Sequence, residues 1–182
     1  MKKALILYGS RYGTAKDTSE KIRDILEKKD IDVKLVNVEE QQPSLMGFDG
    51  VLIGTGIKIG MWMKKIKKFL KKHSKELTNR KFKFGFFVNC GTASEKEKIT
   101  EAKEKYIDNK MQKLELSCDI AAAFGPIYDF SEASRMGNMS QKIMKAGLED
   151  DGWEQIEDIL YDLRDMDQIQ KFAEDFALLL SK

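Results

Sequence analysis

Short apolar runs alternate with longer amphipathic stretches along most of the chain. Five runs have the length and composition of buried strands: residues 4–8, 31–38, 51–53, 84–88 and 120–124. The helical stretches carry apolar residues at three- and four-residue spacing, at 14–29, 62–73, 94–113 and, after a cap at Asp165 or Asp167, 169–180. Because parallel strands need crossover connections that are usually helical, this order predicts an α/β fold: a doubly wound five-stranded parallel sheet with helices on both faces.

Length and composition set the number of domains. The chain has 182 residues, 42% of them hydrophobic, and only two prolines. Such a chain can bury one full core, so we expect a single domain over residues 1–182. Residues 128–150 form an insertion before the C-terminal helix. Met136, Met139, Ile143 and Met144 predict a short amphipathic helix there, whose methionines serve as core filler or as a partner-docking surface.

Several classes of protein are disfavoured by what the sequence lacks. No apolar run approaches membrane-spanning length, and the apolar part of the N-terminus is too short for a secretory signal, so we expect a soluble, cytoplasmic protein that is not membrane-embedded. Cys90 and Cys118 lack metal-ligand spacing and have only His73 as a companion. His73 itself is expected at a helix C-terminus. We therefore expect no metal.

Charge is distributed unevenly, although the net charge is only +2. Residues 58–83 hold eleven Lys or Arg against Glu76 alone, whereas residues 149–182 hold eleven Asp or Glu against three bases. The basic stretch matches no nucleic-acid-binding motif, so no nucleic-acid partner is expected. The lysines of the helix at 62–73 form either a solvated outer face or a surface for weak membrane contact.

The first apolar run is followed at once by a loop rich in small and hydroxyl residues, Gly9 to Ala15. A strand ends there and a helix begins, so backbone N–H groups converge near the positive end of the helix dipole. The pattern is neither Gly-x-x-x-x-Gly-Lys-Ser/Thr nor Gly-x-Gly-x-x-Gly. Turns and helix caps recruit the same residue types, so this loop is either a phosphate cradle or an ordinary strand-to-helix turn.

Two more glycine-containing polar loops follow the third and fourth strands, at Gly54 to Gly60 and at Asn89 to Thr92. In a doubly wound sheet, ligands bind outside the carboxyl ends of the strands, at the point where the strand order reverses. The three loops are expected to meet at that edge, which favours the phosphate cradle for the first.

The first loop resembles the Ser/Thr-x-Thr-Gly-x-Thr phosphate loop of flavodoxins, with Ser10, Gly13 and Thr14 in register and with Tyr12 and Ala15 in place of two threonines. The stretches Ile53 to Lys58 and Tyr161 to Asp165 are similar to segments of archaeal and bacterial flavodoxin-domain proteins, including menaquinone-linked protoporphyrinogen oxidases. The resemblance extends over essentially the whole chain and implies a flavodoxin-like fold with FMN as cofactor.

By this resemblance, each loop would meet one part of FMN. The phosphate would be held by Ser10, Arg11, Tyr12, Gly13, Thr14 and Ala15. One side of the isoalloxazine would be lined by Thr55, Gly56, Ile57, Lys58, Ile59, Gly60, Met61 and Trp62. The pyrimidine edge would meet backbone groups of Asn89, Cys90, Gly91 and Thr92. Two alternatives remain for Trp62, which either stacks on the ring or lies on the buried stripe of its helix.

The implied function is that of a low-potential electron-transfer protein, a monomer or homodimer whose redox partners dock near the flavin edge. No catalytic triad or metal set is recognisable, so an electron carrier is favoured over an enzyme. The alternative is an FMN-dependent flavoenzyme that oxidises a porphyrinogen and passes electrons to a quinone, with residues 128–147 covering the substrate. A third hypothesis is an FMN-free scaffold or sensor, because the first loop lacks two of the usual hydroxyls.

Overall fold

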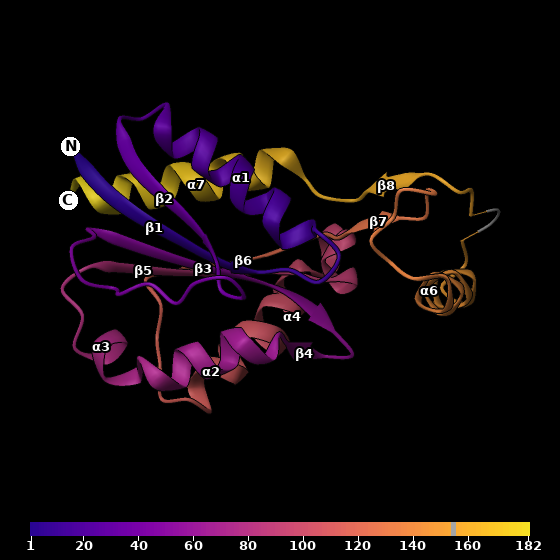
Figure 1. Ribbon diagram of the computed structural model, residues 1–182, viewed down its shortest axis with the longest axis horizontal. Helices are drawn as coiled ribbons and strands as arrows, with labels where there is room; N and C mark the ends of the chain where they lie inside the picture. Colours follow the sequence, from indigo (N-terminus) through magenta and orange to yellow (C-terminus); the bar gives the residue numbers. More distant parts are fainter. Residues whose placement is uncertain (154–155) are drawn as a thin grey trace.

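The central feature of the computed structural model, which describes residues 1–153 and 156–182, is a parallel sheet (Figure 1). Its strands lie in the order β2-β1-β3-β5-β6, and their bounds are Ile31–Asn37, Lys2–Gly9, Gly50–Lys58, Lys83–Asn89 and Ile120–Phe124. All four pairings among them are parallel. The predicted doubly wound five-stranded sheet is therefore confirmed.

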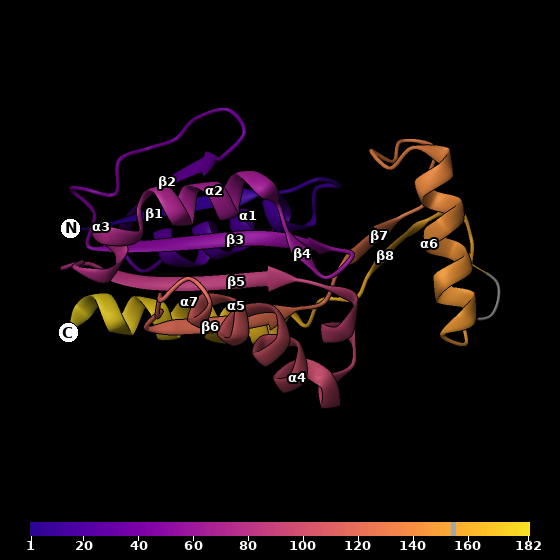
Figure 2. The same cartoon turned by 90° about the horizontal axis from the view of Figure 1, so that it is seen from below.

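Helices cover both faces of this sheet, as the alternating pattern predicted. α1 (Thr14–Glu27) and α7 (Met166–Ser181) lie on one face, and α2 (Lys64–Lys72), α3 (Ser74–Thr78), α4 (Ile99–Lys103) and α5 (Asn109–Gln112) lie on the other (Figures 1 and 2). Asp165 caps α7, because its carboxylate accepts hydrogen bonds from the N–H groups of Asp167 and Gln168 at 3.0 and 3.1 Å. None of the described helices is long and apolar enough to cross a membrane.

The two-residue period of the strands divides the core into two layers. In β1, Leu5 and Leu7 pack with Ile66 and Phe69 of α2, whereas Ala4 and Ile6 face α1 and α7. Full burial of each large apolar side chain contributes about 1.5–3 kcal/mol. The ring of Phe87 lies over Gly54 of the neighbouring strand. A Cβ at Gly54 would overlap this ring, so the position requires glycine.

The stretch 94–113, predicted as one helix, is helical without interruption from Ile99 to Gln112 but contains a π turn. After 3-10 turns at Gly91–Ser94 and Lys96–Lys98, α4 and α5 are joined by a π turn at Glu104–Asp108. A π turn adds one residue, so the consecutive Tyr106 and Ile107 are both buried. The Tyr106 carbonyl then accepts a hydrogen bond from the indole N–H of Trp62 at 2.7 Å.

The third strand is longer than its apolar core, residues 51–53, predicted. It runs on to Lys58, turns at Ile59 and Gly60, and returns as β4 (Met61–Trp62). The φ angles of both turn residues are positive, +48° and +68°, as a two-residue type I′ hairpin requires. Trp62 therefore lies in a strand, and the helix that was predicted from residue 62 begins at Lys64.

The predicted insertion leaves the main body as an arm, which we define as the described residues between 127 and 162. β7 (Ile127–Asp129) and β8 (Leu160–Asp162) pair antiparallel, and α6 (Asn138–Asp150) stands beyond them (Figure 2). α6 is the short helix expected there. The methionines of this segment differ in burial: Met136, which precedes α6, is 3% exposed, Met144 is half-buried and Met139 is 72% exposed. Core filler therefore does not describe Met139.

Candidate functional site

The strand order reverses at β1, which pairs with β2 on one side and β3 on the other. α1 leaves β1 toward one face of the sheet, and α2 leaves the β3–β4 hairpin toward the other (Figure 1). The register sets Gly9 beside Thr55 and Gly56 beside Asn89, so the first and second of the three predicted loops leave neighbouring strand ends, and so do the second and third. This reversal point is where ligands bind in doubly wound sheets.

The loop after β1 presents unpaired backbone donors at the start of a helix. Gly13, with φ of +103°, turns the chain into α1, and its N–H donates to the Ser10 Oγ at 3.1 Å. The first N–H groups of α1, those of Thr14, Ala15 and Lys16, have no intrahelical partner. Because Ser10 accepts through its oxygen, its hydroxyl proton remains available to a ligand. The local chemistry suits an anion such as phosphate.

The side chains of Thr14 and Ala15, also predicted in this loop, are engaged elsewhere or buried. The Thr14 hydroxyl both donates to the Ile127 carbonyl and accepts from the Ile127 N–H, each at 3.3 Å. It thereby ties β7 of the arm to the first turn of α1. The side chain of Ala15 is fully buried, and Arg11 is exposed. Ser10, the exposed Arg11 and backbone groups therefore remain as donors in this loop.

The hairpin after β3 offers backbone and open space rather than polar side chains. The buried Thr55 hydroxyl donates to the Gly56 carbonyl at 3.1 Å and accepts from the Met63 N–H at 3.2 Å, so it supports the hairpin. Nothing lies within 4 Å of the position that a Cβ would take at Gly56 or at Gly60. Ile57 is half-buried, and at the tip Ile59 is 84% and Met61 60% exposed.

Trp62 occupies the core position, which was one of its two predicted alternatives. Its side chain is 7% exposed and its ring centroid lies 4.9 Å from that of Phe86. The hydrogen bond to Tyr106 fixes the indole in that position. A stacking partner for a flavin would have to come from another side chain at this edge.

Tyr12 connects the first loop, the hairpin and the arm. The ammonium of Lys58 donates to its hydroxyl at 2.9 Å and lies 5.4 Å from the ring centroid. The pKa of Tyr12 is lowered, first by this hydrogen bond and then by the nearby side chain of Ser140 on α6. Tyr12, at a threonine position of the resembled phosphate loop, thus binds the hairpin through Lys58 and lies near α6 of the arm.

In the third loop, the first two side chains point away from the site. Asn89 is 3% exposed, and its amide donates to the Thr18 hydroxyl at 3.1 Å and the Gly125 carbonyl at 2.9 Å. Burial raises the pKa of the Cys90 thiol to about 11. A Cβ at Gly91 would lie 2.8 Å from the Tyr128 hydroxyl, and Thr92 is half-buried. A ligand here would meet main-chain groups.

Sequence reasoning gave no role to Arg164, a buried residue that joins the arm to the main body. Its side chain is 3% exposed and lies 2.5 Å from the Asp17 carboxylate, 2.6 Å from that of Asp162 and 3.2 Å from the Thr18 hydroxyl. Asp17 belongs to the first turn of α1, next to the first loop. The only sequence signal was the stretch Tyr161 to Asp165, whose likeness to relatives did not reveal this contact.

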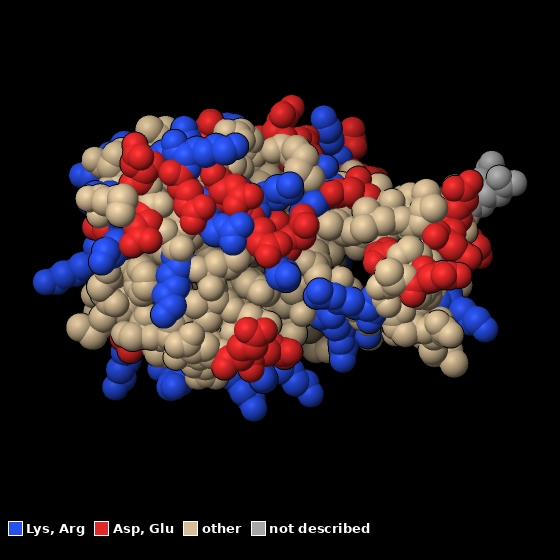
Figure 3. Space-filling model, turned by 45° about the horizontal axis from the view of Figure 1, so that its top comes forward, with Lys and Arg blue, Asp and Glu red and all other residues tan. Residues whose placement is uncertain are grey.

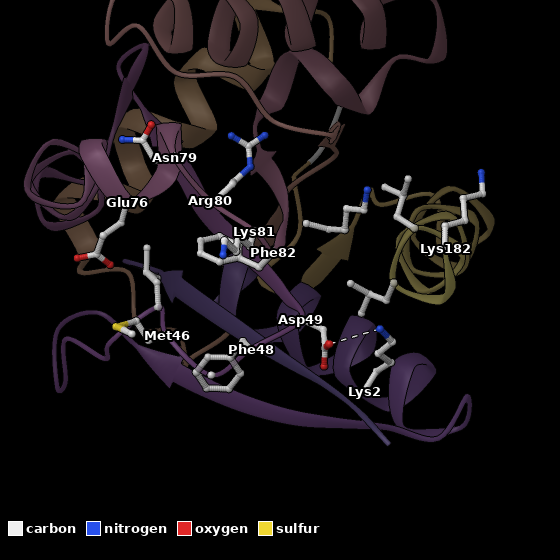
Figure 4. Close-up of a pocket in the computed structure, with 15 residues that line it drawn as sticks. Lys2, Met46, Phe48, Asp49, Glu76, Asn79, Arg80, Lys81, Phe82 and Lys182 are labelled. Carbon is white, nitrogen blue, oxygen red and sulfur yellow. Dashed lines mark hydrogen bonds and ion pairs between the residues drawn. The ribbon is translucent and has the colours of Figure 1, made fainter.

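A cavity of about 680 Å³ lies at the opposite, amino-terminal edge of the sheet (Figure 4). Half-buried Phe48 and Phe82 line it, and Lys2 pairs with Asp49 on one of its walls at 3.4 Å. The strand ends there are Lys2 and Lys83, the starts of β1 and β5. The cavity therefore shares no residue with the three loops.

Comparison with known proteins agrees with this architecture. A family model described as "Flavodoxin domain" matches residues 5–149. The chain belongs to the flavodoxin domain family. No curated protein sequence matches it. Among solved structures, this flavodoxin-domain protein is similar to a flavodoxin from the domain Archaea, with 13% identity, a TM-score of 0.59 and 99% of each chain covered.

Two further structures show the same fold at low identity. Flavodoxin 1 from Bacillus cereus has 13% identity and a TM-score of 0.57, with 97% of each chain covered. Rubredoxin:oxygen oxidoreductase from Desulfovibrio gigas has 13% identity and a TM-score of 0.60, and the match covers 98% of this chain but only 36% of that one. The flavodoxin-like fold predicted from the sequence is thus confirmed.

Proteins of the flavodoxin family typically bind flavin, and the donors at the carboxyl edge can be tested against such a ligand. A flavin phosphate needs converging N–H and hydroxyl donors, which the start of α1 and Ser10 provide. A flat ring needs backbone without intervening side chains, which Gly56 and Gly60 provide. The residues present fit the group. In the described part of the chain, no cluster of His, Cys, Asp or Glu could hold a metal ion.

Proposed function

We propose that this flavodoxin-domain protein binds FMN at the carboxyl edge of its sheet and carries electrons between redox partners. The observation that carries the proposal is the first loop, where a helix N-terminus and the Ser10 hydroxyl point free donors to the reversal of strand order. A phosphate-bearing cofactor would accept hydrogen bonds from these donors. Because flavodoxin-family proteins typically bind flavin, we take that cofactor to be FMN.

In this proposal each element has a separate role. Ser10 and the N–H groups of Thr14 and Ala15 hold the phosphate, and main-chain groups of the hairpin and the third loop orient the ring. FMN, when bound, supplies the electron-transfer chemistry. The Lys58 ammonium favours negative charge at the hairpin, so we expect the reduced cofactor to be less strongly reducing than in relatives with an acidic site.

The test is a titration of the FMN-free protein with FMN, followed by quenching of flavin fluorescence. The proposal predicts one site per chain, a bound cofactor that takes up electrons from dithionite, and reoxidation by an added one-electron acceptor. Riboflavin, which lacks the phosphate, should bind at least about tenfold more weakly because the charged hydrogen bonds are missing. Absence of FMN binding, or equal affinity for riboflavin, would contradict the proposal.

The arm favours a second candidate, an FMN-dependent enzyme that oxidises a porphyrinogen and passes the electrons to a quinone. α6 carries exposed Met139 and Ile143, and Ser140 of the same helix lies near Tyr12 of the first loop. A helix placed there with exposed apolar side chains suits the covering of a large apolar substrate. The FMN-loaded protein would be mixed with protoporphyrinogen and a quinone analogue: quinone-dependent formation of protoporphyrin supports the enzyme, and its absence leaves the carrier.

A further inference from the structure

The outer face of α2 consists entirely of lysines. Ile66, Phe69 and Leu70 are fully buried against the sheet. The six other positions of the helix, all exposed, form what we call the lysine face: Lys64, Lys65, Lys67, Lys68, Lys71 and Lys72. It begins two residues after Trp62, so it borders the hairpin of the candidate site.

The six lysines share one helix face without an acidic partner, whereas on other helices some lysines form ion pairs. On α1 and α7, Lys16 pairs with Glu20 and Lys171 with Asp175. The face that carries α1 and α7 shows basic and acidic side chains intermixed (Figure 3). Within residues 1–153 and 156–182, no ion pair joins the lysine face to a carboxylate; Lys65 and Lys72 donate only to the Glu39 carbonyl and the Gln42 amide oxygen.

The positions of these lysines in the helix also run against helix stability. A helix N-terminus favours negative charge, yet the first turn of α2 holds Lys64, Lys65 and Lys67 and no acidic residue. A helix face selected only for solubility would combine acidic and basic side chains and would place acidic ones in the first turn. The arrangement therefore points to a use for the positive charge.

The basic surface continues onto the neighbouring helix. Burial lowers the pKa of the Lys110 ammonium on α5, and the charges of Lys113 and Lys67 lower it further. Lys71 of α2 and Lys113 border one shallow hollow, which Glu115 also lines. The lysine face and the end of α5 thus repel each other, and an anionic surface laid over both would relieve that repulsion.

We propose that the lysine face, extended by Lys110 and Lys113, docks an acidic electron-transfer protein. The electron-transfer role of the partner rests on the proposed function, whereas its acidity follows from the surface itself. The face borders the hairpin, so a partner seated there lies next to the candidate cofactor edge. The exposed Ile59 and Met61 beside a charged rim match the usual anatomy of a protein interface.

A protein partner fits this surface better than a lipid surface does. Amphipathic helices that bind membranes insert their apolar face between the lipids. The apolar face of α2 is buried in the core of the protein and cannot do so. Only electrostatic adsorption to anionic lipid would remain, and that serves as an outcome of the test.

The test measures binding of two oxidised probe proteins by calorimetry, at about 20 mM and about 300 mM salt. The probes are an acidic plant-type ferredoxin and a basic cytochrome c. We expect the ferredoxin to bind, with an affinity that falls about tenfold or more at the higher salt, and the cytochrome to bind negligibly. The double variant Lys64→Glu/Lys68→Glu should weaken ferredoxin binding about tenfold.

The matched control is Lys21→Glu/Lys34→Glu, which makes the same charge change at exposed lysines on α1 and β2. An equal loss in this control, or binding without charge preference, would overturn the proposal. The proposal would also be overturned if ferredoxin does not bind while phosphatidylglycerol vesicles do, in a salt-sensitive way that requires Lys64 and Lys68. FMN content is measured separately by absorbance: a protein that takes up no FMN but selects ferredoxin refutes the carrier function and leaves the docking surface standing.

Discussion

The amino and carboxyl edges of the sheet differ in whether the backbone N–H groups there have hydrogen-bond partners. At the amino edge, the Asp49 carboxylate accepts the N–H of Lys3 at 2.8 Å and the Asp119 carboxylate accepts the N–H of Phe84 at 2.7 Å. At the carboxyl edge, the first N–H groups of α1 have no intrahelical partner. The cavity of about 680 Å³ lies at the amino edge, but the backbone donors at the start of α1 lie at the carboxyl edge. The candidate site is therefore placed by the unpaired N–H groups at the start of α1 and not by the cavity at the amino edge.

The largest effect is expected from Arg164, the buried cation of the carboxyl edge. Replacing it with alanine (R164A) removes its contacts to Asp17, Asp162 and Thr18 and leaves two carboxylates close together. Both carboxylates are partly exposed, so we expect a loss of about 2 kcal/mol in the free energy of unfolding, below the range for fully buried pairs. Urea denaturation measures it.

The matched variant Arg164→Lys keeps the charge but cannot span both carboxylates with a planar fork. It should recover less than half of the loss. If R164A is as stable as the wild type, Arg164 does not hold the arm to α1, and the carboxyl edge is assembled in some other way.

The second prediction concerns Ser10 and uses Ser44 as its control. Each hydroxyl oxygen accepts a loop N–H at 3.1 Å, from Gly13 at the carboxyl edge and from Met46 near the amino edge. Ser10→Ala should lower FMN affinity about tenfold, or about 1.4 kcal/mol, because a charge-assisted hydrogen bond is lost. Ser44→Ala should leave the affinity unchanged. Equal effects of the two variants, measured by fluorescence titration, would remove the distinction between the edges.

Much of the fold could be predicted because its signals are local. Apolar runs mark the strands, the three- and four-residue spacing of Ile66, Phe69 and Leu70 marks a buried helix face, and Asp165 stands where a cap is needed. The short connections and the alternation of elements then restrict the sheet to few topologies. The loops fall at one edge as a consequence of that topology.

The features that the sequence did not reveal depend on distant contacts. β7 and β8 pair although Tyr128 and Tyr161 are far apart along the chain. The inward turn of Trp62 depends on a carbonyl in the π turn at Tyr106, and the Thr14 hydroxyl is taken up by Ile127. Hydrogen-bonding side chains have several possible partners, and local pattern does not specify which one tertiary packing brings near.

The third prediction concerns the strained tip of the hairpin at the carboxyl edge. Ile59 is β-branched and exposed, yet its φ is +48°, a region that such residues rarely adopt. Asparagine is favoured at this position of a type I′ turn, so Ile59→Asn should raise the free energy of unfolding by about 1 kcal/mol. Ile59→Val retains the branched Cβ and should leave stability unchanged. A destabilised asparagine variant would show that the tip is not strained.

The smallest effect is expected at the amino edge, from Asp49→Asn. The N–H of Lys3 and, less strongly, the ammonium of Lys2 hold the pKa of the Asp49 carboxyl below its usual value. A group with a lowered folded-state pKa stabilises the protein above its unfolded pKa, about 3.9, and loses that contribution as pH falls through the folded pKa. The stability difference between wild type and variant should therefore be largest near neutral pH and shrink below about pH 4. FMN affinity should not change, because Asp49 lies at the edge of the sheet opposite the three loops; a weaker affinity would mean that the two edges are coupled through the strands.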